Sequence, residues 1–327
     1  MSDSTTLPRR TLAIAPMMNR TDRHFRFLMR LITRRTWLYT EMVVARGLVF
    51  GDADKLLRYR AEEHPLSLQV GGHEPEILAQ AAGLAQAYGF DEINLNIGCP
   101  SPRVSAGRMG ACLMAEPERV ADCVAAMCEA SSLPVTVKTR LGIDHDDSME
   151  FLCRFVETVA AAGCSTFIVH ARKAWLDGVS PKANRNIPPL DYGRVAELKR
   201  RYPTLEILIN GGVADLESAA ELLRRVDGVM LGRAAYAQPM LLAAADARFY
   251  ADGSGVTRRA QVLTGYLAYL RECVARGEKL GPALRHVPGV LGGLPGARRV
   301  RARLGALAGT QDVGGVEQAL MPLLETA

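Results

Sequence analysis

The sequence predicts a (β/α)₈ barrel, the TIM-barrel fold, followed by a small all-helical domain. Eight short apolar segments alternate with helical segments over roughly the first 250 residues, and this alternation is typical of a parallel sheet closed into a barrel. After that point the strand pattern stops and apolar residues recur at helical spacing. We therefore expect a barrel over residues 1–250 and a helical domain over residues 251–327, with Gly253-Ser-Gly255 as the linker.

The first half of the barrel opens with an apolar strand at residues 12–15, which Pro16 ends because proline cannot continue a ladder. Thr21 and Asp22 can cap the following helix, where apolar side chains recur every three or four residues from position 25 to 32. Pro75 stands where a later helix begins. The further strands and helices of this half are expected at residues 37–40, 66–70, 77–88, 91–97 and 118–130.

The second half repeats the same alternation of strand and helix. Its strands are expected at residues 135–138, 166–170, 206–210 and 228–231. Its helices are expected at residues 151–162, 192–200 and 216–223, and after Gly232-Arg233. A long loop at residues 171–191 interrupts the pattern. In the last part of the chain, helices are expected at residues 258–275 and 300–307 and at the end of the chain.

The composition limits the classes of protein to which the chain can belong. With 327 residues, of which 48% are hydrophobic and 23% charged, the chain can form a barrel-sized core and a smaller unit. A net charge of +5 is compatible with a polyanionic partner without requiring one. Seven cysteines with no Cys-x-x-Cys pair predict reduced thiols in a cytoplasmic protein and no metal site. Neither a signal peptide nor a membrane span is expected, and no protein partner is implied.

The stretch Asp91-Glu-Ile-Asn-Leu-Asn-Ile-Gly-Cys-Pro100 carries the strongest chemical signal. Its strand places Asn94 and Asn96 on one face, and Gly98 and Pro100 end the strand beside Cys99. Two amides and a thiol suggest a site that holds a polar ring and gives it a proton. The alternative is a core strand that ends in a buried cysteine, because free cysteine is among the most buried residue types.

Polar groups follow almost every predicted strand. In barrels of this type the active site lies at the C-terminal ends of the strands, so these groups should converge there. They are Pro16-Met17, Glu41, Gln69, Asn94, Asn96, Cys99, Lys138, Arg140, His170, Asn210 and Arg233. Any one of them could instead be a structural cap, but their number favours a shared site.

The last two strands end in Asn210-Gly-Gly and Leu231-Gly-Arg. Glycines there let backbone N–H groups approach an anion just before a helix begins, which is the usual phosphate position in these barrels. The bound molecule would then extend over Gln69, Lys138 and His170 and face Cys99. Flavin mononucleotide (FMN) fits this shape, and Lys138 can place a positive charge where negative charge develops on the reduced flavin.

These segments resemble the flavin-dependent tRNA-dihydrouridine synthases over nearly the whole chain. The motifs that carry the resemblance are Ala15-Pro-Met17, Leu68-Gln-Val-Gly-Gly72, Asn94-Leu-Asn-Ile-Gly-Cys-Pro100, Val137-Lys-Thr-Arg140, Ile209-Asn-Gly-Gly212 and Leu231-Gly-Arg233. His170-Ala-Arg-Lys-Ala-Trp-Leu176 and Ser180-Pro-Lys-Ala-Asn-Arg185 are similar to the A-type bacterial branch. That branch modifies uridines 20 and 20a in the D-loop of tRNA.

The resemblance implies a mechanism and a set of site residues. NADPH, with NADH as the alternative, would reduce tightly bound FMN, whose N5 would deliver hydride to C6 of uracil. Cys99 would donate the proton to C5, and Asn94 and Asn96 would help to position flavin and uracil. The family's FMN contacts match Pro16, Met17, Met18, Gln69, Lys138, His170, Asn210, Gly211, Gly212, Gly232 and Arg233.

The resemblance also implies contacts with tRNA at Asn96, Lys182, Arg185, Arg298 and Arg301. The target uracil must leave its stack, which costs a few kcal/mol that contacts elsewhere must offset. Basic runs are more often simply solvated faces, and that alternative stays open for these residues. The segment Asp144-His-Asp-Asp147 could suggest a metal, but we interpret it as a loop and helix start.

Two other functions remain open at this point. One is an FMN barrel that acts on a free pyrimidine, such as a dihydroorotate or dihydropyrimidine dehydrogenase, although the basic helical tail argues against it. The other is a non-catalytic RNA-binding protein on a barrel scaffold, against which Cys99 and the intact flavin rim argue.

Overall fold

A computed structural model describes residues 9–250, 253 and 255–324. Three predictions fall wholly or partly outside these residues: the absence of a signal peptide at the N-terminus, the linker through Ser254, and the end of the last helix. The division into two domains at residue 250 therefore stays a prediction. None of the described helices is both long enough and apolar enough to cross a bilayer.

The described residues form one parallel sheet of nine strands. The strands are β1 (Leu12–Ile14), β2 (Leu38–Tyr39), β3 (Val43–Val44), β4 (Leu66–Gly71), β5 (Glu92–Asn96), β6 (Val135–Arg140), β7 (Thr166–His170), β8 (Glu206–Asn210) and β9 (Gly228–Leu231). Their order is β1-β9-β8-β7-β6-β5-β4-β2, and β3 continues the edge of β4 beyond β2. The ring closes between β1 and β2, where the Ile14 N–H donates to the Trp37 carbonyl at 2.8 Å. The predicted (β/α)₈ barrel is confirmed.

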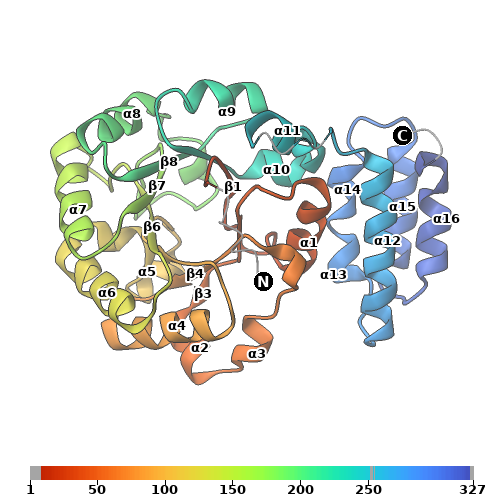
Figure 1. Cartoon of the computed structure of the whole chain (residues 1–327), viewed down its shortest axis with the longest axis horizontal. Coiled ribbons are helices and arrows are strands. Elements are labelled where there is room, and N and C mark those ends of the chain that lie inside the picture. The colour runs from red at the N-terminus through yellow and green to blue at the C-terminus, as the bar shows by residue number, and fades with distance from the viewer. Residues whose placement is uncertain (1–8, 251–252, 254, 325–327) are drawn as a thin grey trace.

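Helices follow the strands around the outside of the barrel (Figure 1). They are α1 (Arg23–Ile32), α2 (Ala45–Phe50), α3 (Ala53–Leu56), α4 (Pro75–Ala87), α5 (Pro102–Ala106), α6 (Pro117–Ala130), α7 (Met149–Ala161), α8 (Tyr192–Arg201), α9 (Leu216–Leu222), α10 (Arg233–Ala237) and α11 (Ala245–Phe249). Asp22 caps α1 by accepting from the backbone N–H groups of His24 and Phe25, as the sequence predicted. Short 3₁₀ turns at residues 61–63, 110–115, 183–185 and 239–242 complete the connections.

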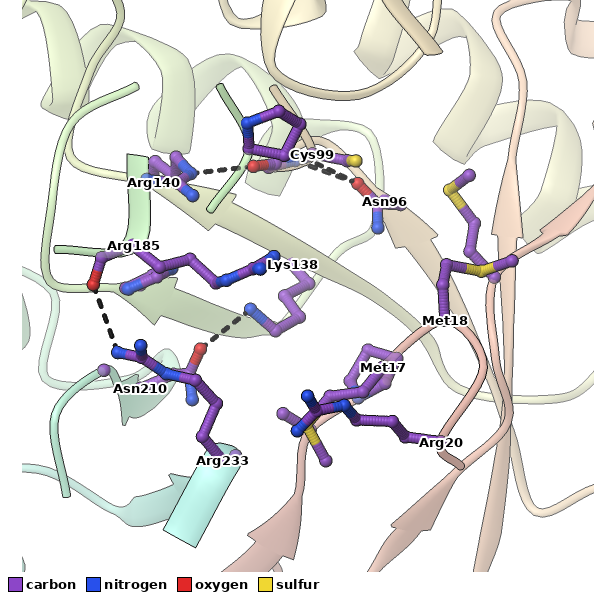
Figure 2. A pocket seen from close by; sticks show the side chains of 18 of the residues that line it. Met17, Met18, Arg20, Asn96, Cys99, Lys138, Arg140, Arg185, Asn210 and Arg233 are labelled. Carbon is purple, nitrogen blue, oxygen red and sulfur yellow. Dashed lines mark hydrogen bonds between the residues drawn. The ribbon is translucent and has the colours of Figure 1, made fainter. Parts of the chain in front are cut away.

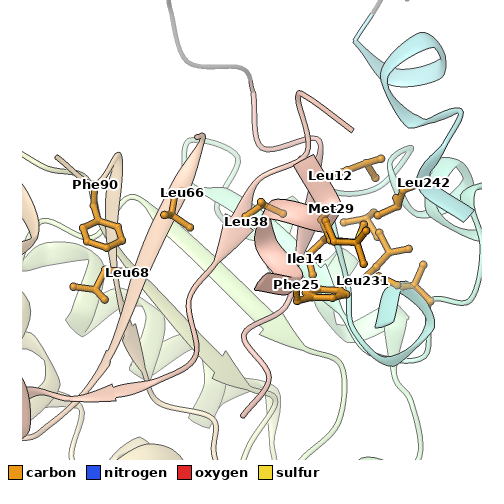
Figure 3. Packing of buried hydrophobic residues seen from close by; sticks show 14 of the residues in the cluster. Leu12, Ile14, Phe25, Met29, Leu38, Leu66, Leu68, Phe90, Leu231 and Leu242 are labelled. Atoms are coloured by element: carbon orange, nitrogen blue, oxygen red, sulfur yellow. The ribbon is translucent and has the colours of Figure 1, made fainter. Parts of the chain in front are cut away.

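One large apolar layer lies between the sheet and these helices. Alternate strand residues point outward into it, so Leu12 and Ile14 of β1 meet Phe25 and Met29 of α1 (Figure 3). All four side chains are essentially fully buried. Burying each one stabilises the fold by about 1.5–3 kcal/mol relative to an exposed side chain. This packing fixes α1 against the barrel and thereby the β1–α1 loop at the barrel mouth.

The interior of the barrel is divided into an apolar half and a polar half. The apolar half lies on β1, on β2 with the residue before it, and on β7 to β9, and consists of Ala13, Ala15, Trp37, Tyr39, Ile168, Leu208 and Met230. The polar half lies on β4, β5 and β6 and includes Ser67, Gln69, Glu92, Asn94, Asn96, Thr136 and Lys138. Buried polar groups are costly unless they are hydrogen-bonded, so the polar half must be a connected network.

Among its described residues, the C-terminal part contains helices joined by turns and no strand. Its helices are α12 (Arg259–Ala275), α13 (Gly281–Leu284), α14 (Val287–Val290), α15 (Ala297–Leu307) and α16 (Val313–Leu324). They pack beside α1 at one side of the barrel (Figure 1). Asp22 at the start of α1 pairs with His286 at 3.0 Å, and Arg23 pairs with Glu278 at 2.5 Å. The helical part is thus anchored to the same helix that fixes the β1–α1 loop.

Candidate active site

A cavity of about 470 Å³ opens at the C-terminal ends of the barrel strands. The structure brings most of the predicted site residues together around it (Figure 2). Those that line it are Pro16, Met17, Met18, Gln69, Asn96, Cys99, Lys138, His170, Arg185, Asn210, Gly211, Gly212, Gly232 and Arg233. Lys182, Arg298 and Arg301 do not line it.

Cys99 lies on a short loop that is tied to the barrel from both sides. The Asn96 side-chain oxygen accepts the backbone N–H groups of Gly98 at 3.1 Å and Cys99 at 3.0 Å (Figure 2). The Gly98 carbonyl accepts from Arg140 Nε at 2.7 Å, and the Cys99 carbonyl accepts from the Ala111 N–H at 2.9 Å. The thiol is therefore partly exposed at the cavity wall on a backbone with little freedom. A group held this way can deliver a proton to one face of a bound ring.

Asn96 and Gln69 form the polar wall beside this loop. Asn96 Nδ2 donates to Gln69 Oε1 at 2.8 Å, and Gln69 Nε2 donates to Asn94 Oδ1 at 2.8 Å. Asn94 is fully buried one layer below the cavity and donates onward to Thr136. Asn94 does not line the cavity, so its predicted help in positioning the bound rings would act through Gln69.

Lys138 lies in the centre of the cavity floor, and its Nζ donates to Asn210 Oδ1 at 3.0 Å (Figure 2). Burial, together with the positive charge of Arg140, lowers the pKa of Lys138 to about 7. Burial and the same two cations hold the pKa of His170 well below its usual value, so this histidine is neutral. The site thus offers a lysine that titrates near neutral pH and a histidine that does not.

The glycines after β8 leave room for a ligand and for tight packing. Gly211 and Gly212 have φ values of 114° and 71°, which favour glycine. A Cβ on Gly211 would lie 2.7 Å from His170 Cδ2, and one on Gly212 would lie 2.5 Å from a Leu190 methyl carbon. Positive φ and these contacts allow only glycine at the two positions, whose backbone also lines the cavity, where an approaching phosphate could meet it.

Five cations surround the cavity, and among its described lining residues there is no carboxylate. Lys138, Arg185 and Arg233 were predicted site residues, and Arg140 was expected among the polar groups at the strand ends without a specific role, whereas Arg20 was not predicted. Arg140 lies two residues after Lys138 on the same face of β6, which is why the strand-end rule predicted it at the cavity. Arg20 had no such signal, because it comes from the β1–α1 loop, where it stacks over Tyr236 at 4.6 Å. The cavity is an anion-binding site by its charge.

The remaining predicted RNA contacts lie away from this cavity. Lys182 is exposed in the loop between β7 and α8, and Arg298 and Arg301 are exposed on α15. Arg301 also lines a second cavity of about 560 Å³ between the barrel and the C-terminal helices, together with Arg259. Arg259 donates to the Gly292 carbonyl at 3.3 Å and Arg301 to the Pro288 carbonyl at 3.2 Å, and neither pairs with a carboxylate among the described residues.

One group of potential metal ligands occurs within the described ranges, at His24, Cys273 and Glu278, whose ligand atoms lie within 4.8 Å of one another. Glu278 already pairs with Arg23 at 2.5 Å and with Arg276 at 3.1 Å. Two arginines so close to the group oppose the binding of a cation. We therefore interpret the group as a contact between α1 and α12 and assign it no metal.

A closed barrel that gathers a thiol, amides and cations in one cavity at its strand ends has the architecture of a barrel enzyme. The family model for dihydrouridine synthase (Dus) matches residues 13–325. The tRNA-dihydrouridine(20/20a) synthase of Shewanella oneidensis is 51% identical over 314 residues, which cover 96% of this chain and 93% of the relative. The synthase of the same name from Salmonella typhimurium is 50% identical over 322 residues, 98% and 97% of the two chains. The chain belongs to the dihydrouridine synthase family, as its motifs predicted, and it is an enzyme.

Proposed function

We propose that the protein reduces the C5–C6 double bond of uridine to dihydrouridine in the D-loop of tRNA, at positions 20 and 20a, in the cytoplasm. Membership of the family and the names of relatives that are about 50% identical support this activity. The observation that carries the proposal is the placement of Cys99 beside a cavity that holds five cations and no carboxylate among its described lining residues. Such a cavity suits both an anionic cofactor and an RNA phosphate.

FMN is the cofactor that these residues fit best. The backbone of Gly211 and Gly212 lines the cavity, and Arg233 lines the same cavity, so both could meet the phosphate. Lys138 and His170 line the same cavity as these glycines and Cys99, so a phosphate-bearing ring system could extend over them. When bound and reduced by NADPH, the flavin would supply the hydride that goes to C6 of uracil.

The chain's own residues would supply the proton and the orientation. Cys99 would hold its proton at Sγ and give it to C5 from the face opposite the flavin. Asn96 and Gln69 would each offer a side-chain N–H to carbonyl oxygens of the bound rings. Each amide nitrogen carries two protons and uses only one of them in a hydrogen bond within the wall. Lys138, when charged, would stabilise negative charge on the flavin ring.

The activity can be tested with purified protein, FMN, NADPH and unmodified tRNA. We expect dihydrouridine at positions 20 and 20a, mapped by mass spectrometry of nuclease fragments, and no comparable turnover of free uracil or uridine. Turnover of free pyrimidines at a rate similar to that of tRNA would favour a small-molecule dehydrogenase. A protein that binds tRNA but neither retains flavin nor forms dihydrouridine would overturn the proposal.

A further inference from the structure

The wall beside Cys99 is the top of a longer hydrogen-bonded column that runs down the polar half of the barrel. Asn96 donates to Gln69, Gln69 to Asn94, and Asn94 Nδ2 to Thr136 Oγ1, each at 2.8 Å. Thr136 then donates to Glu92 Oε1 at 2.9 Å. All five side chains are buried, and Glu92 is completely so. The column therefore links the catalytic loop to a carboxylate at the floor of the barrel.

Both ends of the column fix the direction in which every member points. At the top, the backbone N–H groups of Gly98 and Cys99 can only donate, so the Asn96 oxygen must face them. At the bottom, Glu92 is paired with Arg10 at 2.7 Å, and an ionised carboxylate can only accept. If one amide flipped, two donors or two acceptors would face each other, and buried polar groups would lose their partners.

We propose that Glu92 is a positioning residue for Cys99, acting through this column, an inference that rests on the proposed function. Because the Glu92 carboxylate can only accept, each side chain in the column points a donor toward the next one below it. The last amide, that of Asn96, therefore points its oxygen toward the Cys99 loop. The same polarity leaves the spare N–H groups of Gln69 and Asn96, rather than their oxygens, for bound ring carbonyls. Glu92 would thus fix the orientation of the Cys99 loop and of the spare N–H groups of Gln69 and Asn96 without touching the substrate.

The substitution Glu92→Gln should reverse the column rather than merely weaken it. Arg10 can only donate, so it should claim the single oxygen of the new amide and turn the NH₂ group toward Thr136. The Thr136 hydroxyl can switch roles, accepting from below and donating to Asn94 above. Each amide above would then be driven to flip, which would set the Asn96 NH₂ group against the N–H groups that hold the Cys99 loop.

The chain offers a matched control on the other side of Arg10. Glu206 also pairs with Arg10, at 2.8 Å, and it accepts from Thr166 at 2.8 Å. Thr166 is the direct neighbour of Thr136 in the sheet register, yet the bonds of its hydroxyl do not lead to the amides. Glu206→Gln and Thr166→Val therefore change the same kinds of group at the same floor and leave every member of the column in place, although Arg10 is shared by both carboxylates and Glu206 is more exposed than Glu92.

The first measurement is hydrogen exchange at the backbone amides of Gly98 and Cys99 in the flavin-free protein. We expect exchange to be at least about fivefold faster in Glu92→Gln, the factor that corresponds to one net hydrogen bond, and unchanged in Glu206→Gln. This measurement needs neither cofactor nor RNA, so it decides the inference even if the wild-type protein does not reduce uridine. The second measurement is turnover with tRNA, where we expect a loss of at least about tenfold for Glu92→Gln alone.

Coupling between Glu92 and Thr136 separates positioning from a general structural defect. In the double variant Glu92→Gln with Thr136→Val, the new amide is cut off from Asn94, so exchange and turnover should return toward the values of Thr136→Val alone. Independent structural damage would instead multiply the two single effects. If Glu92→Gln does not fold, Thr136→Val should still exchange about two- to fivefold faster than Thr166→Val. Equal behaviour of Glu92→Gln and Glu206→Gln, or of Thr136→Val and Thr166→Val, would overturn the inference.

Discussion

Lys138 Nζ hydrogen-bonds Asn210 Oδ1 at 3.0 Å across the barrel mouth, from β6 to β8. The Asn210 amide is fixed in this orientation, because its Nδ2 donates to the Met230 carbonyl at 2.7 Å. A neutral amide oxygen offsets little of the cost of burying an ammonium group, and no carboxylate joins the pair among the described residues that line the cavity. Lys138 is therefore held where a bound anion could neutralise its positive charge.

The affinity for FMN should fall as the pH rises above 7. Burial and Arg140 lower the pKa of free Lys138 to about 7, and an anionic ligand should raise it, so binding takes up a proton in this range. Each pH unit above 7 should weaken binding by up to about tenfold. Titration of FMN into flavin-free protein between pH 7 and pH 9, followed by fluorescence, checks this; the phosphate, with its second pKa near about 6, is already doubly ionised there.

Two variants serve as controls for this pH dependence. Lys138→Met removes the titrating group and Lys138→Arg keeps a permanent charge, so in both the affinity should be nearly independent of pH. His170 does not interfere, because its pKa lies well below the range measured. A flat profile in the wild-type protein would contradict the prediction.

Cys99→Ala should separate the two half-reactions. We expect full FMN content and reduction by NADPH within about threefold of wild type, with dihydrouridine formation lowered by about 100- to 10,000-fold, the usual cost of losing a general acid. Cys112→Ala is the matched control, since Cys112 is also partly exposed but donates to the Met109 carbonyl and does not line the cavity. Product formation by Cys99→Ala within threefold of Cys112→Ala would remove the thiol from the mechanism.

Arg233→Ala should weaken FMN by about 10- to 150-fold, the range for a hydrogen bond to a charged group. Arg233 also donates to Asn186 Oδ1 at 2.8 Å and to the Arg185 carbonyl at 3.2 Å, so the substitution could act through the loop instead. Riboflavin, which lacks the phosphate, distinguishes the two effects in the same equilibrium titration. Its affinity should stay unchanged if Arg233 binds phosphate, and equal weakening of both ligands would assign the effect to the loop.

The arginines of α15 allow a test of RNA binding within one helix. Arg298 and Arg301 are three residues apart and share a face, while Arg299 and Arg303 are four apart and share another. The double substitution of Arg298 and Arg301 by Ala should weaken tRNA binding and flatten its log–log salt dependence by about two units, one per phosphate contact. The flavin half-reaction with NADPH should not change.

The same change of charge at Arg299 and Arg303 serves as the control for that experiment. If the first face contacts phosphates, the control pair should leave the salt dependence nearly as in wild type. Equal effects of the two pairs would indicate a general attraction between the basic helix and RNA, and no effect of either pair would mean that both faces are simply solvated.

The elements that sequence reasoning found are those with strong periodicity. The barrel strands and their major helices fell close to their expected places, because apolar strands and long amphipathic helices carry their pattern locally. The structure adds β3, which has only two residues, one partly buried and one exposed, and so had no pattern to detect. It also adds α13 and α14, whose four-residue segments contain Pro and Gly and are helical through tertiary packing.

The candidate site was predictable where residues end strands and less so elsewhere. Cys99, Lys138 and Asn210 follow directly from the rule that barrel sites lie at strand ends. Arg20 could not be found this way, because its position depends on a loop and on packing against Tyr236 from a distant part of the chain. Glu92 could not be found either, since it begins its strand and only the three-dimensional hydrogen-bond pattern connects it with Cys99.

The division of the barrel interior has a consequence for how such proteins can diverge. In the apolar half, Ile168, Leu208 and Met230 need only fill volume, and exchanges among residues of similar size cost little there. In the polar half each side chain needs a partner of defined donor or acceptor type. A single substitution there leaves neighbouring donors or acceptors without a partner. Substitutions should therefore accumulate at these apolar interior positions of β7 to β9 more readily than at the interior positions of β4 to β6, so that sequence divergence is uneven around the barrel.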